Sequence, residues 1–129
     1  MANLYERGVS FERELVNKFW SRGWASFRCA GSGSIPETVP DVIAIKSNDV
    51  VALECKKTKS EKISLKKDVT NLSNFSEISG ARCYIAVKFT RELPRFFRID
   101  DIIARGNYTI SLKTPHLNFD ALIREQTLL

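Results

Sequence analysis

Histidine and cysteine are scarce in this chain of 129 residues, and their scarcity excludes several kinds of site. The one histidine, His116, has no recognisable partner motif, so a Ser-His-Asp triad is not expected. The three cysteines, Cys29, Cys55 and Cys83, are separated by 26 and 28 residues, and this spacing matches neither a zinc site nor a disulfide framework. Each lies within an apolar run, so we expect three reduced residues of the core.

Long apolar runs are missing as well. No stretch approaches the roughly 20 residues that a helix needs to span a bilayer. Residues 1–16 are charged and lack the apolar segment and cleavage site of a secretory signal. We therefore expect no membrane contact and a cytoplasmic protein. With 43% hydrophobic and 27% charged residues, the composition is that of a globular protein, and the length predicts a single domain over residues 1–129.

Positive charge is in moderate excess. The chain has 20 Lys and Arg against 15 Asp and Glu, which gives a net charge of +5. Such a surplus favours a polyanionic partner such as nucleic acid, although many basic proteins bind none.

Hydrophobic periodicity predicts an α/β fold, a mixed sheet flanked by helices. A strand reached through a helix is usually parallel to an earlier neighbour, so the strand after the second helix is expected beside the strand that carries Glu54. We expect Ser64 to cap that helix and Gly80 to end it. The expected helices are 9–20, 64–80 and 118–125, and the expected strands are 24–29, 41–46, 50–56, 81–89, 95–99 and 107–112.

The strands at 41–46 and 50–56 are joined by a short turn-prone link and are expected to form an antiparallel hairpin. Because side chains alternate between the faces of a strand, Glu54 and Lys56 share one face of the second strand. Asp41 opens the first strand, just after Pro40, and a hairpin brings a strand's first residues beside its partner's last ones. The sequence therefore gathers Asp41, Glu54 and Lys56 at one end of the hairpin.

Carboxylates in such a segment need a metal ion, an opposite charge or a hydrogen-bond donor. Mg²⁺ takes oxygen ligands, and Asp41, Glu54 and the backbone carbonyl of Cys55 are a fitting supply. Lys56 is on the correct face to add positive charge beside a phosphate. Glu12 shares a stripe of the first helix with core residues and is placed to hold a water or a second ion. A simpler interpretation stays open, in which Glu54 and Lys56 form an exposed ion pair worth less than about 1 kcal/mol.

The stretch from Pro40 to Lys56 resembles the PD-(D/E)xK nuclease signature, and its surroundings resemble a narrower family. The segments SFERELV, RCAGSGS, VPDVIAIK and LECKK together are similar to the archaeal Holliday junction resolvase family, which archaeal viruses also carry. The likeness covers roughly residues 7–90 in unbroken order. It implies a restriction-endonuclease-like fold and a homodimeric, Mg²⁺-dependent endonuclease, with Mn²⁺ as an alternative ion. Such an enzyme binds four-way DNA junctions and nicks two opposing strands, in an archaeal or an infected cell.

The resemblance also implies roles for individual residues. Glu12, Asp41 and Glu54 match the acidic metal-binding set, and Lys56 matches the catalytic lysine. Ser32 matches a serine that reaches toward the cleaved strand, although a plain linker serine is also compatible with the sequence. The positions assigned to DNA binding are Arg13, Arg28, Ser32, Ser34, Lys57, Lys59 and Lys62.

Family members often carry a glutamine at the start of the second helix, where this sequence has Asp68 and Val69, so the resemblance assigns no active-site role to that helix and its role stays open. Lysines from Lys57 to Lys67 form either a solvated surface or a ridge that contacts phosphates. Of the adjacent Phe96 and Phe97, one is expected in the core and the other is a candidate subunit contact. Two alternatives to junction resolution stay open: a nuclease for duplex or other branched DNA, and a non-catalytic DNA-binding protein.

Overall fold

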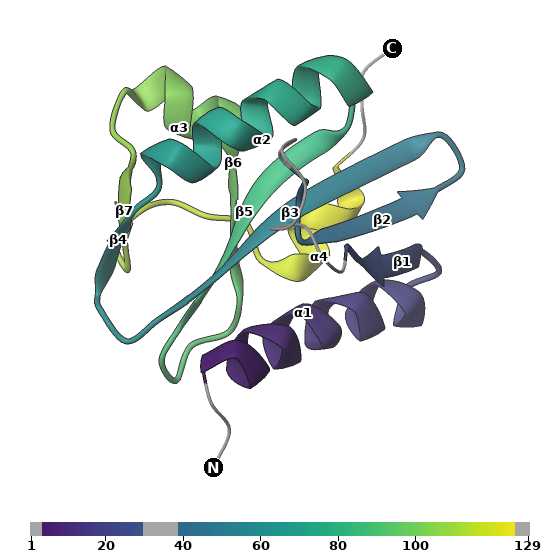
Figure 1. The fold of residues 1–129 in the computed structure, drawn as a ribbon, viewed down its shortest axis with the longest axis horizontal. Coiled ribbons are helices and arrows are strands. Elements are labelled where there is room, and N and C mark those ends of the chain that lie inside the picture. The colour runs from purple at the N-terminus through teal and green to yellow at the C-terminus, as the bar shows by residue number, and fades with distance from the viewer. Residues whose placement is uncertain (1–3, 30–38, 126–129) are drawn as a thin grey trace.

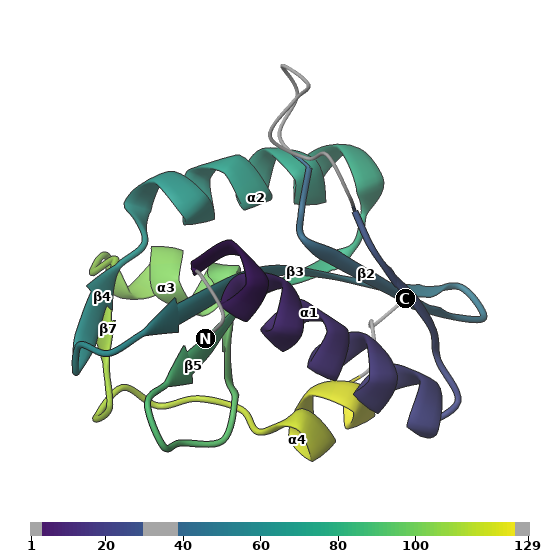
Figure 2. The same cartoon turned by 60° about the horizontal axis from the view of Figure 1, so that its bottom comes forward.

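The chain folds into a layer of strands between two layers of helices in a computed structural model that describes residues 4–29 and 39–125 (Figures 1 and 2). Helices α2 and α3 cover one face of the sheet, and α1 and α4 cover the other. The helices are α1 (Leu4–Ser21), α2 (Lys66–Ser79), α3 (Ile99–Arg105) and α4 (Phe119–Arg124). The strands are β1 (Ala25–Arg28), β2 (Val42–Lys46), β3 (Asp49–Thr58), β4 (Lys62–Ser64), β5 (Arg82–Phe89), β6 (Arg95–Arg98) and β7 (Thr109–Ser111).

The main sheet has five strands in the order β1-β2-β3-β5-β6. The predicted hairpin is confirmed, because β2 and β3 pair antiparallel with Val42 opposite Leu53. The predicted parallel strand is confirmed too, since β5 runs parallel to β3 with Glu54 beside Ile85. Strands β1 and β6 pair antiparallel at the two edges, so the sheet is mixed, as the sequence predicted.

Alternation along β3 divides its side chains between two separate cores. Ala52 packs with the residues under α2 and α3, whereas Val51 and Leu53 pack with those of α1 and α4. Glu54 and Lys56 follow Ala52 in the alternation, so they lie on the α2 side. Cys55 packs against the α1 side.

Several local expectations are wrong. Ser64 lies in β4, and α2 is capped by Leu65 without a side-chain hydrogen bond, because the chain enters the helix directly from the small β4–β7 sheet. Gly80 does end α2, in the left-handed conformation with φ of 72° that glycine tolerates. Phe96 and Phe97 face opposite cores, but both are buried, so neither is available as a subunit contact.

The short elements β4 and α3 were not predicted. Strand β4 has three residues inside a lysine-rich segment, and it exists because Ile63 pairs with Ile110 of β7. Helix α3 has seven residues, of which Ile99 and Ile102 are buried under α2. Neither stretch is long enough to carry a periodic signal of its own. Among the described residues, no helix combines the length and the apolar character that crossing a membrane requires.

Candidate functional site

The site begins where β2 starts, at the end of the hairpin. The Asp41 amide donates to the Leu53 carbonyl at 2.9 Å, and the Cys55 amide donates to Asp41 Oδ2 at 2.8 Å. The side chain of Asp41 thus takes the place that a further β2 carbonyl would occupy. The regular register of β2 and β3 ends at the pair of Val42 and Leu53. Beyond that pair the carboxyl groups of Asp41 and Glu54 lie close enough together for a side-chain hydrogen bond.

Glu54 is half-buried, and its Oε1 is a buried atom with no hydrogen-bond partner among the described residues. Burial raises the pKa of Glu54 to about 9, with further contributions from a hydrogen bond to Asp41 and from the negative charge of Asp41. Two close carboxyl groups cannot both be charged cheaply unless a cation lies between them. Asp41 and Glu54 therefore form an acidic pair whose charge Lys56 offsets only in part, since the pKa of Glu54 stays raised although Lys56 acts to lower it.

Lys56 is the third predicted residue at this end, and its ammonium turns toward α2. Its Nζ lies 3.0 Å from Oδ1 of Asp68, in the first turn of α2. Burial acts to lower the pKa of Lys56, but the hydrogen bond and charge of Asp68, followed by the charges of Glu54 and Asp41, outweigh burial and raise that pKa overall. The lysine therefore stays protonated. The sequence left the role of this helix open, and the structure places Asp68 of α2 in contact with the predicted catalytic lysine.

Glu12 approaches Asp41 from α1, on the opposite side of the sheet from Glu54. Its Oε1 accepts from Arg28 Nε at 3.0 Å, and both side chains are half-buried. Burial and the charge of Asp41 raise the pKa of Glu12, while Arg28 acts to lower it. The carboxylate of Glu12 is therefore repelled by the charge of Asp41 and is neutralised by its ion pair with Arg28. Its assignment as a metal ligand stays a prediction, as does the contact of Arg28 with DNA.

The donors present fit a small divalent cation. In an antiparallel ladder the N–H and C=O of one residue point to the same neighbour, so the Cys55 carbonyl points toward the side where its amide meets Asp41. Two carboxylate groups and a carbonyl at one strand end are the oxygen donors that Mg²⁺ uses, with waters completing the shell. In the part of the chain that the structure describes, no three His, Cys, Asp or Glu side chains form a group that could hold a metal. The fit therefore rests on Asp41, Glu54 and the Cys55 carbonyl.

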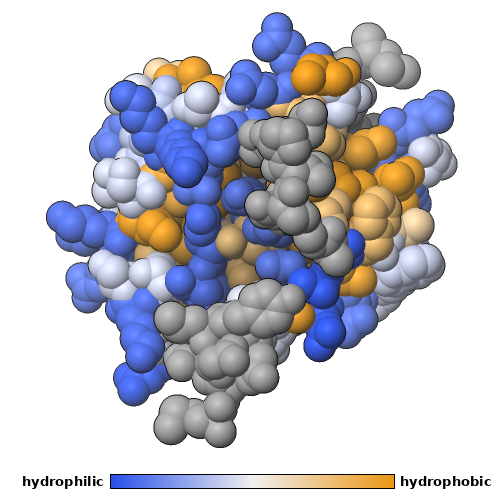
Figure 3. Space-filling view, viewed as in Figure 1, coloured by the Kyte–Doolittle hydropathy of each residue, from blue (hydrophilic) through white to orange (hydrophobic). Residues whose placement is uncertain are grey.

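The lysines after the acidic pair separate into two groups. Lys57 and Lys59 are exposed and line a cavity of about 620 Å³ beside the ends of β3 and β5, together with Lys88 and Arg91. Lys62, on β4, is exposed but is not among the residues that line this cavity. In Figure 3, hydrophilic surface covers the side of the molecule where β4 and the start of α2 lie.

Arg91 was not predicted as part of this surface. It is exposed, and its φ of 67° places it in the left-handed region that non-glycine residues rarely adopt. Several hydrogen bonds hold the turn. The Glu92 amide donates to the Phe89 carbonyl at 3.0 Å, the Lys88 ammonium donates to the Glu92 carbonyl at 2.8 Å, and the Thr90 amide donates to the Thr58 carbonyl at 3.2 Å. Nothing local in the sequence marked Arg91, because the cavity that it lines together with Lys59 is formed by the pairing of β3 with β5.

The remaining predicted DNA contacts are less defined. Arg13 is exposed on α1. Ser32 and Ser34 lie outside the described residues, and their roles stay predictions.

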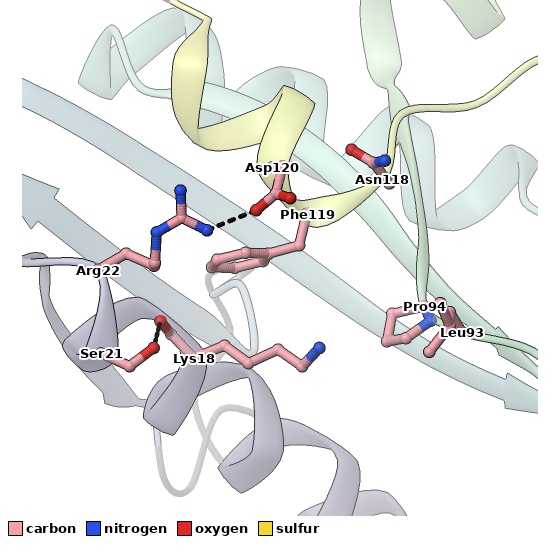
Figure 4. A pocket seen from close by; sticks show the side chains of 8 residues that line it. All are labelled: Lys18, Ser21, Arg22, Leu93, Pro94, Asn118, Phe119 and Asp120. Carbon is pink, nitrogen blue, oxygen red and sulfur yellow. Dashed lines mark hydrogen bonds and ion pairs between the residues drawn. The ribbon is translucent and has the colours of Figure 1, made fainter.

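Another cavity, of about 330 Å³, lies at the C-terminal end of α1 (Figure 4). It is lined by residues of α1, of α4 and of the loop before β6, including Lys18, Leu93 and Phe119. Arg22 and Asp120 form an ion pair across it, and the Lys18 ammonium lies 5.8 Å from the centre of the Phe119 ring. None of the residues of the acidic pair lines this cavity, so it is separate from the candidate site.

This chain is similar to known proteins over most of its length. Residues 3–128 match the family model described as archaeal Holliday junction resolvase (Hjc). The crossover junction endodeoxyribonuclease Hjc of Sulfolobus acidocaldarius is 34% identical over 125 residues, which span 92% of this chain and 87% of that protein. The crossover junction endodeoxyribonuclease Hje of Saccharolobus islandicus is 30% identical over 131 residues, spanning 94% of this chain and 95% of that protein.

A solved structure is similar over nearly the same extent. Hjc of Archaeoglobus fulgidus, a Holliday junction resolvase, matches with a TM-score of 0.75 at 32% identity, covering 85% of this chain and 93% of that one. The residues matched by the family model include all the helices and strands of the sheet's two faces, and they include both Asp41 and Glu54. The chain belongs to the archaeal Holliday junction resolvase family.

Proposed function

We propose that this chain is a structure-selective DNA endonuclease that binds four-way junctions as a homodimer and resolves them by paired, Mg²⁺-dependent nicks in opposing strands. Endonuclease activity follows from membership of the family. One observation carries the proposal for the site: the close carboxyl pair of Asp41 and Glu54, in which Glu54 Oε1 is buried without a hydrogen-bond partner among the described residues, with the Lys56 ammonium on the same face of β3. Both cores of the described chain share one sheet, which supports a single nuclease domain over residues 1–129.

The proposed ion is Mg²⁺, held by Asp41, Glu54 and the Cys55 carbonyl. Bound there, a divalent ion supplies positive charge against a phosphate oxygen and makes a nearby water more acidic. Lys56 lies on the same face and presents its ammonium to the same phosphate, where charge builds as the bond breaks. The opposite face of the hairpin, under α1, is closed by apolar residues, so the substrate backbone approaches from the α2 side or along the strand end.

Glu12 and Arg28 are proposed to act at the edge of this site. A DNA phosphate that takes the Arg28 guanidinium would release the carboxylate of Glu12 toward Asp41. Glu12 would then join the acidic set only when substrate is bound. The exposed cations Lys57, Lys59 and Arg91 are proposed to track the backbone of a junction arm, because phosphate contacts dominate the affinity of proteins for DNA.

The proposed dimer uses the apolar surface of β1 and β2. Phe27 of β1 is 51% exposed and Ile45 of β2 is 36% exposed, and by alternation both lie on the same face of the sheet as Ile43, the α2 side. Figure 3 has its largest hydrophobic area over these strands. Exposed apolar clusters of this kind commonly mark protein interfaces, and a two-fold dimer presents two identical sites to a substrate that itself has two-fold symmetry.

The deciding experiment incubates the protein with Mg²⁺ and either a four-way junction or a linear duplex of matching sequence. We expect symmetric paired nicks in the junction and little cutting of the duplex. Equal cutting of both substrates would indicate a general duplex nuclease, and junction binding without cutting would indicate a non-catalytic binder.

Asp41→Asn tests the site within the same assay. We expect cleavage to fall at least about a hundredfold because the acidic pair is lost, while junction affinity stays near that of the unaltered protein. Asp100→Asn, an exposed aspartate in the first turn of α3, makes the same charge change away from the site and should cut normally. An Asp41→Asn protein that cuts at the normal rate would refute the assigned site.

A further inference from the structure

Asp68 is the acidic residue that the structure brings to the site from a separate layer. It lies in the first turn of α2, with its Oδ1 3.0 Å from Nζ of Lys56 and only 19% of its side chain exposed. The next residue, Val69, is buried, and so is Leu72, one turn further along. The helix backbone beneath Asp68 is therefore fixed by the core, and the carboxylate has a defined place.

Lys56 needs such a partner more than most lysines do. Its side chain has four flexible methylene groups, and a protonated amine two residues after Glu54 is attracted by the acidic pair itself. An ammonium bonded to Glu54 would cancel the negative charge that a cation needs at that position. An ammonium free in solvent would have no fixed relation to the phosphate.

We propose that Asp68 is a positioning residue that holds the Lys56 ammonium on the α2 side of the acidic pair, where it is ready to contact the phosphate to be cleaved. This inference rests on the proposed nuclease function. Asp68 does not itself touch substrate. Its carboxylate takes one of the hydrogen bonds of the ammonium and leaves two for the phosphate, and it keeps Lys56 from neutralising Glu54.

The structure gives a reason for an acid at this position. β3 and α2 are packed together through the core that includes Ala52 and Val69, so the distance between the lysine and the aspartate is set by that packing. A charged hydrogen bond between two anchored elements restricts a flexible side chain more strongly than a neutral one does.

The first test separates chemistry from binding. Single-turnover cleavage of a saturating four-way junction, and the junction Kd, are measured for Asp68→Asn and Asp68→Glu, with Asp100→Asn as the matched control. We expect Asp68→Asn to slow cleavage of bound junction by about tenfold or more, as losses of supporting contacts at such sites commonly do. We expect its Kd to change no more than that of Asp100→Asn, and Asp68→Glu to recover part of the rate.

The second test asks whether Asp68 acts through Lys56. In a Lys56→Gln background, adding Asp68→Asn should cause no further loss of rate, because the lysine that Asp68 positions is already gone. An equal loss in both backgrounds would overturn the proposal, since Asp68 would then support the fold or the site by another route. A normal cleavage rate for Asp68→Asn would overturn it as well.

Thermal melting of each variant accompanies both tests. If Asp68→Asn lowers the melting temperature more than Asp100→Asn does, the comparison in the Lys56→Gln background still decides the question, because a folding defect persists in that background. A failure of the proposed nuclease function can be distinguished from a failure of this inference by the behaviour of the unaltered protein. In that case the unaltered protein itself fails to cut four-way junctions, whereas failure of this inference leaves normal cutting that does not depend on Asp68.

Discussion

Glu54→Gln should make the ion-free protein more stable at alkaline pH, although it removes a residue proposed to be essential. The reason is that the folded chain keeps a proton on Glu54 far above the ordinary pKa of 4.5, up to a pKa of about 9. Burial is the main cause, and the neighbouring carboxyl of Asp41 adds to it. Ionising Glu54 in the absence of a cation therefore opposes folding, and glutamine, which has nearly the same shape, cannot ionise.

The sign of the effect follows from counting protons. Between the ordinary pKa of 4.5 and the folded pKa of about 9, the folded state binds a proton that the unfolded state has lost. The free energy of unfolding of the unaltered protein must then fall as the pH rises through this window. One pKa unit corresponds to about 1.4 kcal/mol, and even a quarter of the shift gives about 1–2 kcal/mol. For a domain of this size that is about 4–8 °C in melting temperature.

The assay is thermal unfolding in EDTA at several values between about pH 5 and pH 9. We expect the melting curves of Glu54→Gln and the unaltered protein to agree near the acid end and to separate steadily toward the alkaline end, with the variant more stable. Adding Mg²⁺ should reverse the order, because an ion that binds the ionised pair stabilises the folded protein and releases the proton.

Glu77→Gln is the matched control, since Glu77 is exposed near the far end of α2. It should track the unaltered protein at every pH, with and without Mg²⁺. A Glu54→Gln protein whose stability difference does not change with pH would refute the idea that Glu54 carries a proton in the fold. A Mg²⁺ effect of equal size in both proteins would refute the assigned ion site.

Three further predictions test the surfaces around the site. Arg91→Ala should weaken junction binding and reduce the slope of log affinity against log salt by about 0.9, the value for one lost phosphate contact. Arg124→Ala on α4 is the control and should leave the slope unchanged. Equal slopes for the unaltered protein and both variants would show that the β5–β6 turn does not contact DNA. We expect the unaltered protein to sediment as the proposed dimer at micromolar concentration and Ile45→Glu to sediment as a monomer. An Ile45→Glu protein that still sediments as a dimer would refute the proposed interface. Asp49→Ala should lower the free energy of unfolding by about 1–2 kcal/mol in urea, because it removes the carboxylate that accepts two hydrogen bonds from the Arg82 guanidinium, at 2.8 and 2.9 Å. A change below about 0.5 kcal/mol would contradict this.

Fold and site differ in how far local sequence predicts them. The hairpin, its register and the face that Glu54 shares with Lys56 follow from alternation along β3, which depends only on neighbouring residues. The parallel β5 follows from an intervening helix. The three-residue β4 could not be predicted in this way, because it is stabilised by pairing with a strand far away in the sequence.

In the site, too, contacts within the hairpin could be predicted from the sequence, whereas contacts between separate elements could not. Asp41 and Glu54 meet because a two-strand hairpin brings them together, and this local geometry could be inferred directly. The ion pair between Arg28 and Glu12 depends on how α1 lies against β1, and that angle is set by packing of the whole face. Arg28 therefore acquired a carboxylate partner that its sequence position alone did not indicate.

By itself, the sequence determined which residues alternate, where strands turn and which charges lie at a strand end, because these depend on the bonded geometry of nearby residues. Tertiary structure alone decided that Asp68 reaches Lys56, that Arg91 and Lys59 line one cavity and that Glu12 and Glu54 lie on opposite sides of one sheet. Those contacts join residues from separate layers, and their distances are fixed by the packing of two cores, which no short stretch of sequence encodes.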